Sequence, residues 1–163
     1  MNHQINTRYA TKQDAASMCT LLNDIIVIGG TTAYEIELDE LRFCEYFLTG
    51  DNCICCIVAH KTVSILGFQA LSIRSDLPAG WVDIATFARP HQKVRGVGTT
   101  LFNATIQHLE GGDYTHINAS IRADNRSGLA YYEKMGFTDY DIRRGVPLKD
   151  GTPVDRIAKQ FII

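Results

Sequence analysis

The sequence predicts an α/β or α+β domain in which helices pack on a mixed sheet. Short strand-like runs alternate along the chain with stretches whose apolar residues recur at helical spacing. The chain has 163 residues, of which 45% are hydrophobic and 21% charged, so it can bury one sizeable core. No internal repeat, low-complexity stretch or linker-like segment divides it. We therefore expect a single domain over residues 1–163.

The first third of the chain predicts one strand and two helices. Residues 5–9 form a strand-like run, and Thr11-Lys-Gln-Asp14 resembles a capping box in which Asp replaces the usual Glu or Gln. The helix that follows ends at Gly29-Gly30, and a polar loop over 31–35 leads to a second short helix over 38–48. The first helix is expected to bury Met18, Leu21, Leu22, Ile25 and Ile26, and the second Leu41, Cys44, Phe47 and Leu48.

The remaining elements continue this alternation. Two strand-like runs separated by Lys61-Thr-Val predict an antiparallel hairpin. Glycines mark the ends of the two helices that lie beyond it. The expected strands are 53–60, 64–74, 81–88, 115–121, 137–142 and 156–163, and the expected helices are 96–109 and 125–135.

Charge and hydropathy exclude two classes of partner. The formal net charge is −2, whereas a phosphate-binding surface needs a surplus of Lys and Arg, so a nucleic-acid partner is disfavoured. No apolar run reaches the roughly 18 residues that a membrane helix requires. The start of the sequence also lacks the layout of a signal peptide. We expect a cytoplasmic protein without a membrane partner.

The cysteines favour a structural role. Three of the five lie in the apolar run Cys53-Ile-Cys-Cys-Ile-Val-Ala59, which is typical of a buried strand where cysteine serves as a small hydrophobic residue. The odd number argues against a disulfide framework. Cys53 and Cys56 have the C-x-x-C spacing of redox or metal sites, but no second ligand pair has zinc spacing, and the five histidines form no metal motif. We expect no metal site.

Segment 81–101 is the most informative about function. A strand runs into a short loop, and the loop into a helix whose first turn contains Gly96 and Gly98. Helix N-termini expose unpaired N–H groups and the positive end of the helix dipole, and glycine removes the Cβ that would obstruct an anion. The segment predicts a pyrophosphate site, with Lys93 and Arg95 adding positive charge. A Rossmann fingerprint would need a third glycine and a P-loop a Gly-Lys pair, and neither is present.

Two blocks of the sequence resemble the GNAT superfamily of N-acetyltransferases. Lys93-Val-Arg-Gly96-Val-Gly98 is similar to the family's acyl-CoA signature Gln/Arg-x-x-Gly-x-Gly/Ala, with lysine in the first place. Asn125-Arg-Ser-Gly-Leu-Ala-Tyr-Tyr132-Glu-Lys-Met-Gly136-Phe137 resembles the family's Asn-x-x-Ala/Ser-x-x-x-Tyr-x-x-x-Gly-Phe. Gly128 stands at the small position of this second block. Together with the order of elements, the resemblance covers the whole chain.

The resemblance implies a mostly antiparallel sheet with helices on both faces and central strands that splay apart to hold acyl-CoA. Acetyl-CoA is then the implied co-substrate, without a metal. Backbone groups near Thr86, Phe87 and Ala88 would bond to its pantetheine arm, as an added strand pairs with a sheet edge. Asn125 would touch the cofactor near its thioester. The pyrophosphate would be held by the backbone of Val94, Arg95, Gly96, Val97, Gly98 and Thr99.

The resemblance also implies two catalytic side chains. Acyl transfer to an amine needs a neutral nitrogen, a polarised thioester carbonyl and a proton for the departing thiolate. Tyr132 matches the family's general acid, which protonates the sulfur. Asp83 lies close to where many members carry a glutamate base, and its shorter side chain favours a water relay to the amine.

A narrower resemblance concerns the acceptor. Loop 31–35 is similar to that of phosphinothricin acetyltransferase-like members, which acetylate small amino-acid-like amines, and 149–155 follows their Lys-x-Gly-x-x-x-Asp pattern without the usual Arg-Trp. Tyr34 and Glu35 could line the acceptor pocket, and Arg74 could hold a substrate carboxylate bidentately. We expect direct acetyl transfer, in a ternary complex, to the primary amine of a small molecule such as an amino acid.

Two other functions remain open at this stage. Acetylation of a protein N-terminus or lysine would need an open groove rather than a lidded pocket. A sensor module that binds CoA without turnover would keep the cofactor cleft, although the presence of Asp83 and Tyr132 weighs against it. The resemblance also leaves a homodimer open.

Overall fold

A seven-stranded sheet runs through the molecule in the order β1-β2-β3-β4-β5-β7-β6. The computed structural model describes residues 4–92 and 94–163. Strands β4 and β5 pair in parallel and the other neighbours pair antiparallel, which confirms the mixed, mostly antiparallel sheet. The strands are β1 (Asn6–Tyr9), β2 (Cys53–Lys61), β3 (Ser64–Ser72), β4 (Trp81–Ala88), β5 (His116–Arg122), β6 (Thr138–Pro147) and β7 (Pro153–Ile162).

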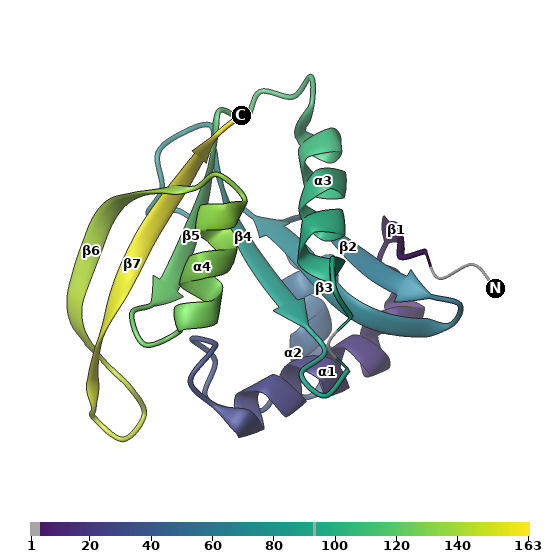
Figure 1. The fold of residues 1–163 in the computed structure, drawn as a ribbon, viewed down its shortest axis with the longest axis horizontal. Coiled ribbons are helices and arrows are strands. Elements are labelled where there is room, and N and C mark those ends of the chain that lie inside the picture. Colours follow the sequence, from purple (N-terminus) through teal and green to yellow (C-terminus); the bar gives the residue numbers. More distant parts are fainter. Residues whose placement is uncertain (1–3, 93) are drawn as a thin grey trace.

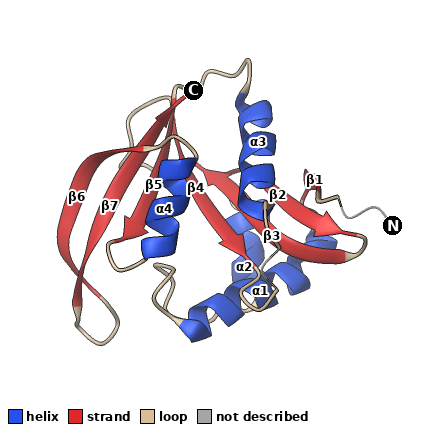
Figure 2. Cartoon of the chain, viewed as in Figure 1, coloured by secondary structure: helices blue, strands red, loops and turns tan. Residues whose placement is uncertain are grey.

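Helices cover both faces of this sheet (Figures 1 and 2). Helices α1 (Ala15–Ile28) and α2 (Glu40–Cys44) pack on one face, where Phe43 and Phe68 are fully buried. Helices α3 (Val97–Leu109) and α4 (Arg126–Lys134) pack on the other face, around residues such as Ile117. In the part of the chain that the structure describes, no helix is long and apolar enough to span a membrane.

The start of α1 confirms the capping-box prediction. A 3₁₀ turn over Lys12–Asp14 precedes the helix, and the Asp14 carboxylate accepts a hydrogen bond from the Thr11 N–H at 2.8 Å. Arg8 pairs with the same carboxylate at 2.7 Å and, with these hydrogen bonds, lowers the pKa of Asp14 to about 2. Asp14 can therefore take the position where Glu is usual, because Arg8 on β1 forms an ion pair with its carboxylate. Gly29, with φ of +77°, ends α1.

The second helix differs from the prediction. Helix α2 ends at Cys44 and continues as a π-helical turn over Glu45–Thr49, whose wider turn breaks the regular 3.6-residue spacing. Phe47 is buried in the core as expected, and Phe43, which was not expected there, packs beside it with ring centroids 4.9 Å apart. The expected face was therefore wrong at Leu41, whose side chain is 84% exposed.

The last two strands are longer than their hydrophobic patterns indicate. Strand β6 was expected to end at residue 142 but extends to Pro147, and β7 begins at Pro153 rather than at 156. Nearly every residue of β6 is exposed, so the strand carries no apolar alternation to mark its end. Backbone pairing with β7 defines it, down to the Pro147–Pro153 pair.

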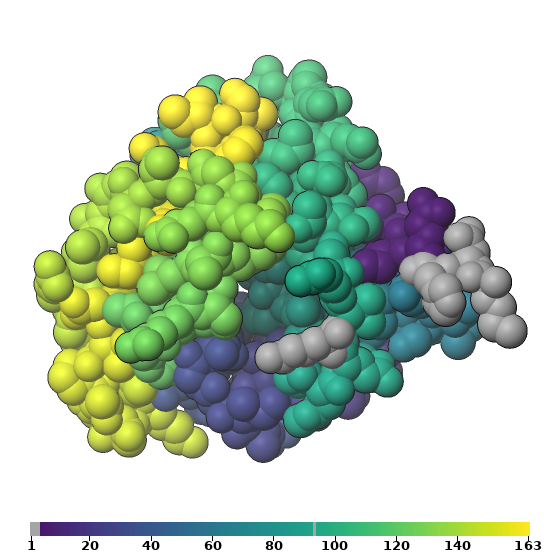
Figure 3. All heavy atoms as spheres, in the orientation of Figure 1, coloured from purple at the N-terminus to yellow at the C-terminus, as the bar shows by residue number. Residues whose placement is uncertain are grey.

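The central parallel pair opens along its length. Strands β4 and β5 pair through three residues only, from Trp81–His116 to Asp83–Asn118. Strand β4 then continues to Ala88 and β5 to Arg122 without further pairing, and the two ribbons diverge in Figure 1. The space-filling view is hollowed between α4 (green) and the segment that leads into α3 (teal) (Figure 3). The expected splay of the central strands is present in the structure.

Candidate active site

The diverging strands leave one edge of β4 without a partner. On its other edge the Arg89 N–H donates to the Leu66 carbonyl at 2.8 Å. Hydrogen-bonded residues alternate along an antiparallel pair, so the backbone of Phe87 also faces β3. The backbone groups of Thr86 and Ala88 face the open side. The expectation for Phe87 is corrected, because its backbone pairs with β3 and its side chain is buried in the core beneath α1.

The N-terminus of α3 lies at the end of this open edge. Gly96 is the N-cap and has φ of +91°, a conformation that favours glycine. The Thr100 N–H bonds to the Gly96 carbonyl at 2.9 Å, so the N–H groups of Val97, Gly98 and Thr99 precede the first intrahelical bond. They form a positive helix terminus suited to an anion.

The residues before this terminus divide into two kinds. Arg95 is exposed and can reach a bound anion, while Val94 packs against the apolar cluster between β2 and α3. Lys93, which occupies the first place of the signature, lies outside the described residues. The positive charge that the structure describes at this turn therefore comes from Arg95 and the helix terminus.

Gly98 has a different reason to be small than the sequence indicated. A Cβ at this position would lie 2.6 Å from the Cε2 atom of Tyr131 on α4. The Tyr131 hydroxyl donates to the Gly98 carbonyl at 2.8 Å, so ring and hydroxyl together hold α4 against the first turn of α3. Glycine at 98 is thus required by helix packing rather than only by an approaching phosphate. Tyr131 was not singled out from the sequence, because the family motif contains the adjacent Tyr132.

Tyr132 lies on α4 beside the open edge of β4. Its hydroxyl is 3.0 Å from the Thr86 Oγ1 atom, and only 6% of the residue is exposed. Burial raises the pKa of Tyr132 well above its usual value, and the nearby Tyr131 and the negative charge of Asp83 add to the shift. The phenol therefore keeps its proton at neutral pH, as a general acid must before it reacts.

A buried glutamine connects the two tyrosines. Gln69 is 1% exposed, and its amide nitrogen donates to Thr86 at 2.7 Å and to the Tyr131 hydroxyl at 3.2 Å. Its amide oxygen accepts from Thr105 on α3. This network fixes Thr86, and through it Tyr132, relative to α3. The sequence signal was a single polar residue within the apolar run of β3, and it was overlooked.

Asp83 lies where β4 and β5 begin to diverge. Its carboxylate accepts a hydrogen bond from the Asn118 amide of β5 and lies 3.6 Å from an Arg74 nitrogen. Burial raises the pKa of Asp83, outweighing the two contacts, which lower it. The Tyr140 hydroxyl donates to the Asn118 carbonyl oxygen at 2.7 Å and so fixes the amide orientation. A carboxylate with a raised pKa is better suited to accept a proton.

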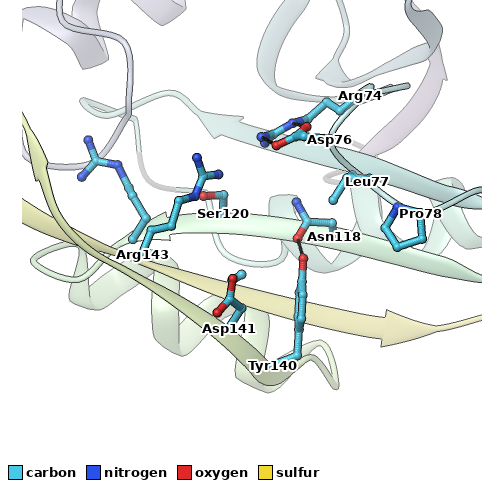
Figure 4. A pocket seen from close by; sticks show the side chains of 11 residues that line it. Arg74, Asp76, Leu77, Pro78, Asn118, Ser120, Tyr140, Asp141 and Arg143 are labelled. Atoms are coloured by element: carbon cyan, nitrogen blue, oxygen red, sulfur yellow. Dashed lines mark hydrogen bonds and ion pairs between the residues drawn. The ribbon is translucent and has the colours of Figure 1, made fainter.

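Arg74 is occupied, contrary to the expectation that it holds a substrate carboxylate. Its guanidinium makes a bidentate pair with Asp76, at 2.9 and 2.6 Å, and the two side chains lie against each other in Figure 4. Its remaining nitrogen is the one that lies near Asp83. Arg74 therefore acts on the electrostatics of Asp83, and its fork is not free for a second carboxylate.

The two residues expected from loop 31–35 take different places. Tyr34 packs its ring against Phe47 and Phe87, and burial raises the pKa of Tyr34 to about 12, with a contribution from the charge of Asp83. Glu35 instead accepts the Lys149 N–H at 3.0 Å, which joins this loop to the β6–β7 connection. The expected pocket role of Glu35 is corrected to a tie between two loops.

Asn125, which was expected to touch the cofactor near its thioester, caps the start of α4. Its side-chain oxygen accepts the Gly128 N–H at 2.9 Å at the start of α4, and its amide donates to the Thr31 carbonyl at 2.9 Å. A Cβ at Gly128 would clash with the side-chain amide of Asn125. The Asn-x-x-Gly spacing is therefore explained by capping and by anchoring loop 31–35.

A cavity of about 360 Å³ adjoins Asp83 on the sheet face opposite α4 (Figure 4). Asn118 and Arg74, the two partners of Asp83, are both in its wall. The volume lies in the range of small-molecule sites. The wall consists of Arg74, Asp76, Leu77, Pro78, Asn118, Ser120, Tyr140, Asp141, Arg143, Arg156 and Ala158.

The cysteines lie apart from these groups, on β2 and the helices. All five are free thiols. Burial raises the pKa of Cys53, and it raises the pKa of Cys55 to about 11, so both remain protonated and poorly nucleophilic at neutral pH. Within residues 4–92 and 94–163, no cluster of His, Cys, Asp or Glu could hold a metal ion.

Comparison with known proteins adds a family to this geometry. The model of the acetyltransferase (GNAT) family matches residues 17–137. A mycothiol acetyltransferase of Streptomyces coelicolor is 26% identical over 84 residues, which make up 52% of this chain but only 27% of that protein.

Solved structures share the fold over nearly the whole chain. An N-acetyltransferase from Staphylococcus aureus Mu50 has a TM-score of 0.86 at 18% identity and covers 98% of both chains. A phosphinothricin acetyltransferase from Sinorhizobium meliloti, in complex with AcCoA, has a TM-score of 0.83 at 20% identity, covering 98% of this chain and 88% of its own.

Proposed function

Because the chain belongs to the acetyltransferase (GNAT) family, we propose that it transfers the acetyl group of acetyl-CoA to the primary amine of a small molecule, with an amino acid or analogue as the leading acceptor. The observation that carries this proposal is the early end of β4–β5 pairing. It leaves an open strand edge that leads from Asp83 to the positive terminus of α3. The acetyl-CoA bound to the Sinorhizobium meliloti relative supports the choice of co-substrate.

The cofactor is proposed to lie along this edge. The backbone of Thr86 and Ala88 offers the hydrogen bonds that an added strand would make, which suits the amide-containing pantetheine arm. The N–H groups of Val97, Gly98 and Thr99 suit the pyrophosphate. The thioester would then come between Tyr132 on one side of the sheet and the cavity on the other.

The proposed reaction is direct transfer. A water held by Asp83 takes a proton from the acceptor's ammonium group, and the neutral nitrogen attacks the thioester carbon. The new C–N bond forms as the C–S bond breaks, and Tyr132 gives its proton to the sulfur of CoA. Asp83 passes the first proton to solvent, takes up the second nitrogen proton through the same water, and a proton from solvent then restores the phenol of Tyr132. A cysteine intermediate is not part of this proposal, because the thiols of β2 are protonated and lie on the far side of β3 from the open edge.

The size of the cavity supports a small acceptor. The cavity adjoins the proposed base, and the Glu35–Lys149 contact brings together loop 31–35 and the β6–β7 connection. The likeness to a phosphinothricin acetyltransferase structure is a further support for an amino-acid-like amine.

A thiol-release assay tests this function. The protein is incubated with acetyl-CoA and each member of a panel of free amino acids, and separately with peptides that carry a free N-terminus or a lysine. We expect free CoA to appear with the small amines. Turnover on the peptides alone would replace the proposal by a protein acetyltransferase. Heat of acetyl-CoA binding without turnover on any amine would replace it by a sensor module.

Asp83→Asn is expected to lower kcat/KM roughly 10²- to 10⁴-fold, because the general base is lost while the Asn118 contact can persist. The raised pKa of Asp83 predicts the pH profile. Because ionised Asp83 takes the proton from the bound ammonium group, log(kcat/KM) of the wild type is expected to rise with slope one below the raised pKa of Asp83 and to level off above it. The variant depends on amine that is already neutral in solution, so its log(kcat/KM) is expected to keep a slope of one above that pKa as well. Equal slopes in both proteins would remove Asp83 from the mechanism.

A further inference from the structure

Three arginines lie side by side across the last strands of the sheet. Arg122 on β5 is paired with Arg156 on β7, and Arg156 with Arg143 on β6. Directly paired residues of antiparallel strands project from the same face, so the three side chains leave one face of the sheet together. This is the face that carries Asn118 and Ser120, which stand at every second position before Arg122 along β5.

The three guanidinium groups differ in what they bind. Arg122 makes a bidentate pair with Asp124, at 2.9 and 2.6 Å. Arg156 is only 9% exposed, and within the described residues its one side-chain hydrogen bond is a long one, 3.5 Å to the Val154 carbonyl. Among the residues that the structure describes, neither Arg156 nor Arg143 has a carboxylate within ion-pair distance.

An unpaired buried guanidinium is costly. Removing a charge from water without a partner costs several kcal/mol, and buried charges in proteins are nearly always paired. Burial and the neighbouring Arg122 lower the pKa of Arg156, with Glu35 and Asp124 too distant to form an ion pair with it. Among the described residues no fully buried side-chain nitrogen lacks a hydrogen-bond partner, so the remaining N–H groups of Arg156 face the cavity, where an anion can replace water.

Such an anion has a place to bind. Arg156 and Arg143 line the cavity that adjoins Asp83, together with Ser120 and Asn118. The wall also contains two carboxylates, of which Asp76 is paired with Arg74 and Asp141 accepts the Ile142 N–H. Three arginines against two aspartates leave the wall with an excess of one positive charge. From Asn118 to the level of Arg156 the sheet extends over four residues, about 13 Å of strand. Because an arginine side chain is long, the distance between its guanidinium and Asn118 is shorter than this length of strand. A small acceptor can bridge the distance that remains.

We propose that Arg156, assisted by Arg143, binds the carboxylate of the acceptor and so selects amines that carry an acid group. The planar fork of arginine matches a carboxylate with two parallel hydrogen bonds. The proposal rests on the proposed amine acetyltransferase function and names its substrate class. It also moves the carboxylate site from Arg74, whose fork is filled, to the buried arginine that has no partner.

The test compares Arg156→Met with the wild type on matched acceptors. Each amino acid that the wild type acetylates is used beside its own amide, which keeps the amine and side chain but lacks the carboxylate. We expect Arg156→Met to lower kcat/KM for the free amino acid roughly 10- to 100-fold, the effect of losing hydrogen bonds to a charged group. Its kcat/KM for the amide and its KM for acetyl-CoA are expected to stay within about twofold, since neither contacts Arg156.

A control variant and a measurement of Tm separate binding from folding. Arg144→Met removes an exposed arginine that is absent from the cavity wall, and it is expected to retain full activity. The Tm of Arg156→Met is expected to equal or exceed that of the wild type, because methionine replaces an uncompensated buried charge. A clear fall in Tm would give Arg156 a structural role and overturn the proposal, as would an equal loss of activity on amino acid and amide.

Failure of the proposed function would be recognised separately, as no wild-type turnover on any amine. Calorimetric titration of free amino acids into the CoA-loaded protein then tests the carboxylate site by itself. Heat with the wild type and none with Arg156→Met would support the site. No heat with either protein would overturn it.

Discussion

Tyr132→Phe is expected to lower kcat roughly 10²- to 10⁴-fold and to leave the affinity for acetyl-CoA nearly unchanged. The substitution removes one hydroxyl, whose partner Thr86 keeps its hydrogen bond from Gln69. The fold should therefore persist. The thiolate of CoA then leaves without a proton from the enzyme, which affects the chemical step and not binding. Thiol release under saturating acetyl-CoA measures the loss.

Tyr131→Phe is the matched control for this prediction. It deletes the hydroxyl of the adjacent residue on the same helix, and with it the bond to the Gly98 carbonyl. We expect a change in stability or in the KM for acetyl-CoA, because α4 is held less firmly on the first turn of α3. The value of kcat should change far less than in Tyr132→Phe. Wild-type kcat in Tyr132→Phe would exclude Tyr132 as the acid.

Much of the fold could be predicted because its elements have apolar faces. Strand β4 was predicted with its observed bounds, and the hairpin of β2 and β3 followed from two apolar runs and a short turn. Prediction failed where burial gives no regular pattern. In the second helix Leu41 is exposed and Phe43 is buried, the reverse of the expected face, and the exposed residues of β6 show no alternation.

The candidate site was predictable to the level of its motifs but not of its side-chain partners. The two motifs identified the α3 terminus and Tyr132, which depend on local spacing. Glu35 and Lys149 meet across 114 residues of sequence, and whether Arg74 is free depends on Asp76 and Asp83. A single sequence contains no signal for such contacts, since any surface arginine or glutamate could be free or paired.

Arg156 shows the same limit of prediction from sequence, because nothing in the sequence marks it as unpaired. In the sequence it is an ordinary polar residue of the last strand, and only register and burial distinguish it from Arg144, whose side chain is 77% exposed. Tertiary structure thus determines which arginine lacks a partner. The same holds for Gln69, whose importance follows from three contacts made on three different elements.

Gly96→Glu is expected to weaken acetyl-CoA binding by roughly 1000-fold. The new carboxylate would stand at the positive terminus of α3, where the pyrophosphate is proposed to bind. Two unit charges about 4 Å apart repel by about 4 kcal/mol at an effective dielectric constant of 20, which corresponds to about three powers of ten in Kd. Calorimetric titration of acetyl-CoA measures the change.

Backbone strain also contributes, and control variants separate it from charge. Gly96 has φ of +91°, so any side chain costs conformational energy there, roughly 1 kcal/mol for alanine. Gly96→Ala carries that strain without the charge and is expected to change Kd less than 10-fold. Gly111→Glu introduces the same side chain at a similar φ of +76° just beyond the opposite end of α3, in open space. Its Kd is expected to match the wild type.

These three variants together decide where the phosphates bind. If Gly96→Ala weakened binding as much as Gly96→Glu, strain in the turn would account for the effect and charge would not. If Gly111→Glu bound acetyl-CoA as weakly as Gly96→Glu, a negative charge near either end of α3 would be enough to weaken binding. A loss confined to Gly96→Glu requires an anion close to that terminus. The open edge of β4 leads from this terminus to Tyr132 and Asp83, so the acetyl group would then lie between the proposed acid and base.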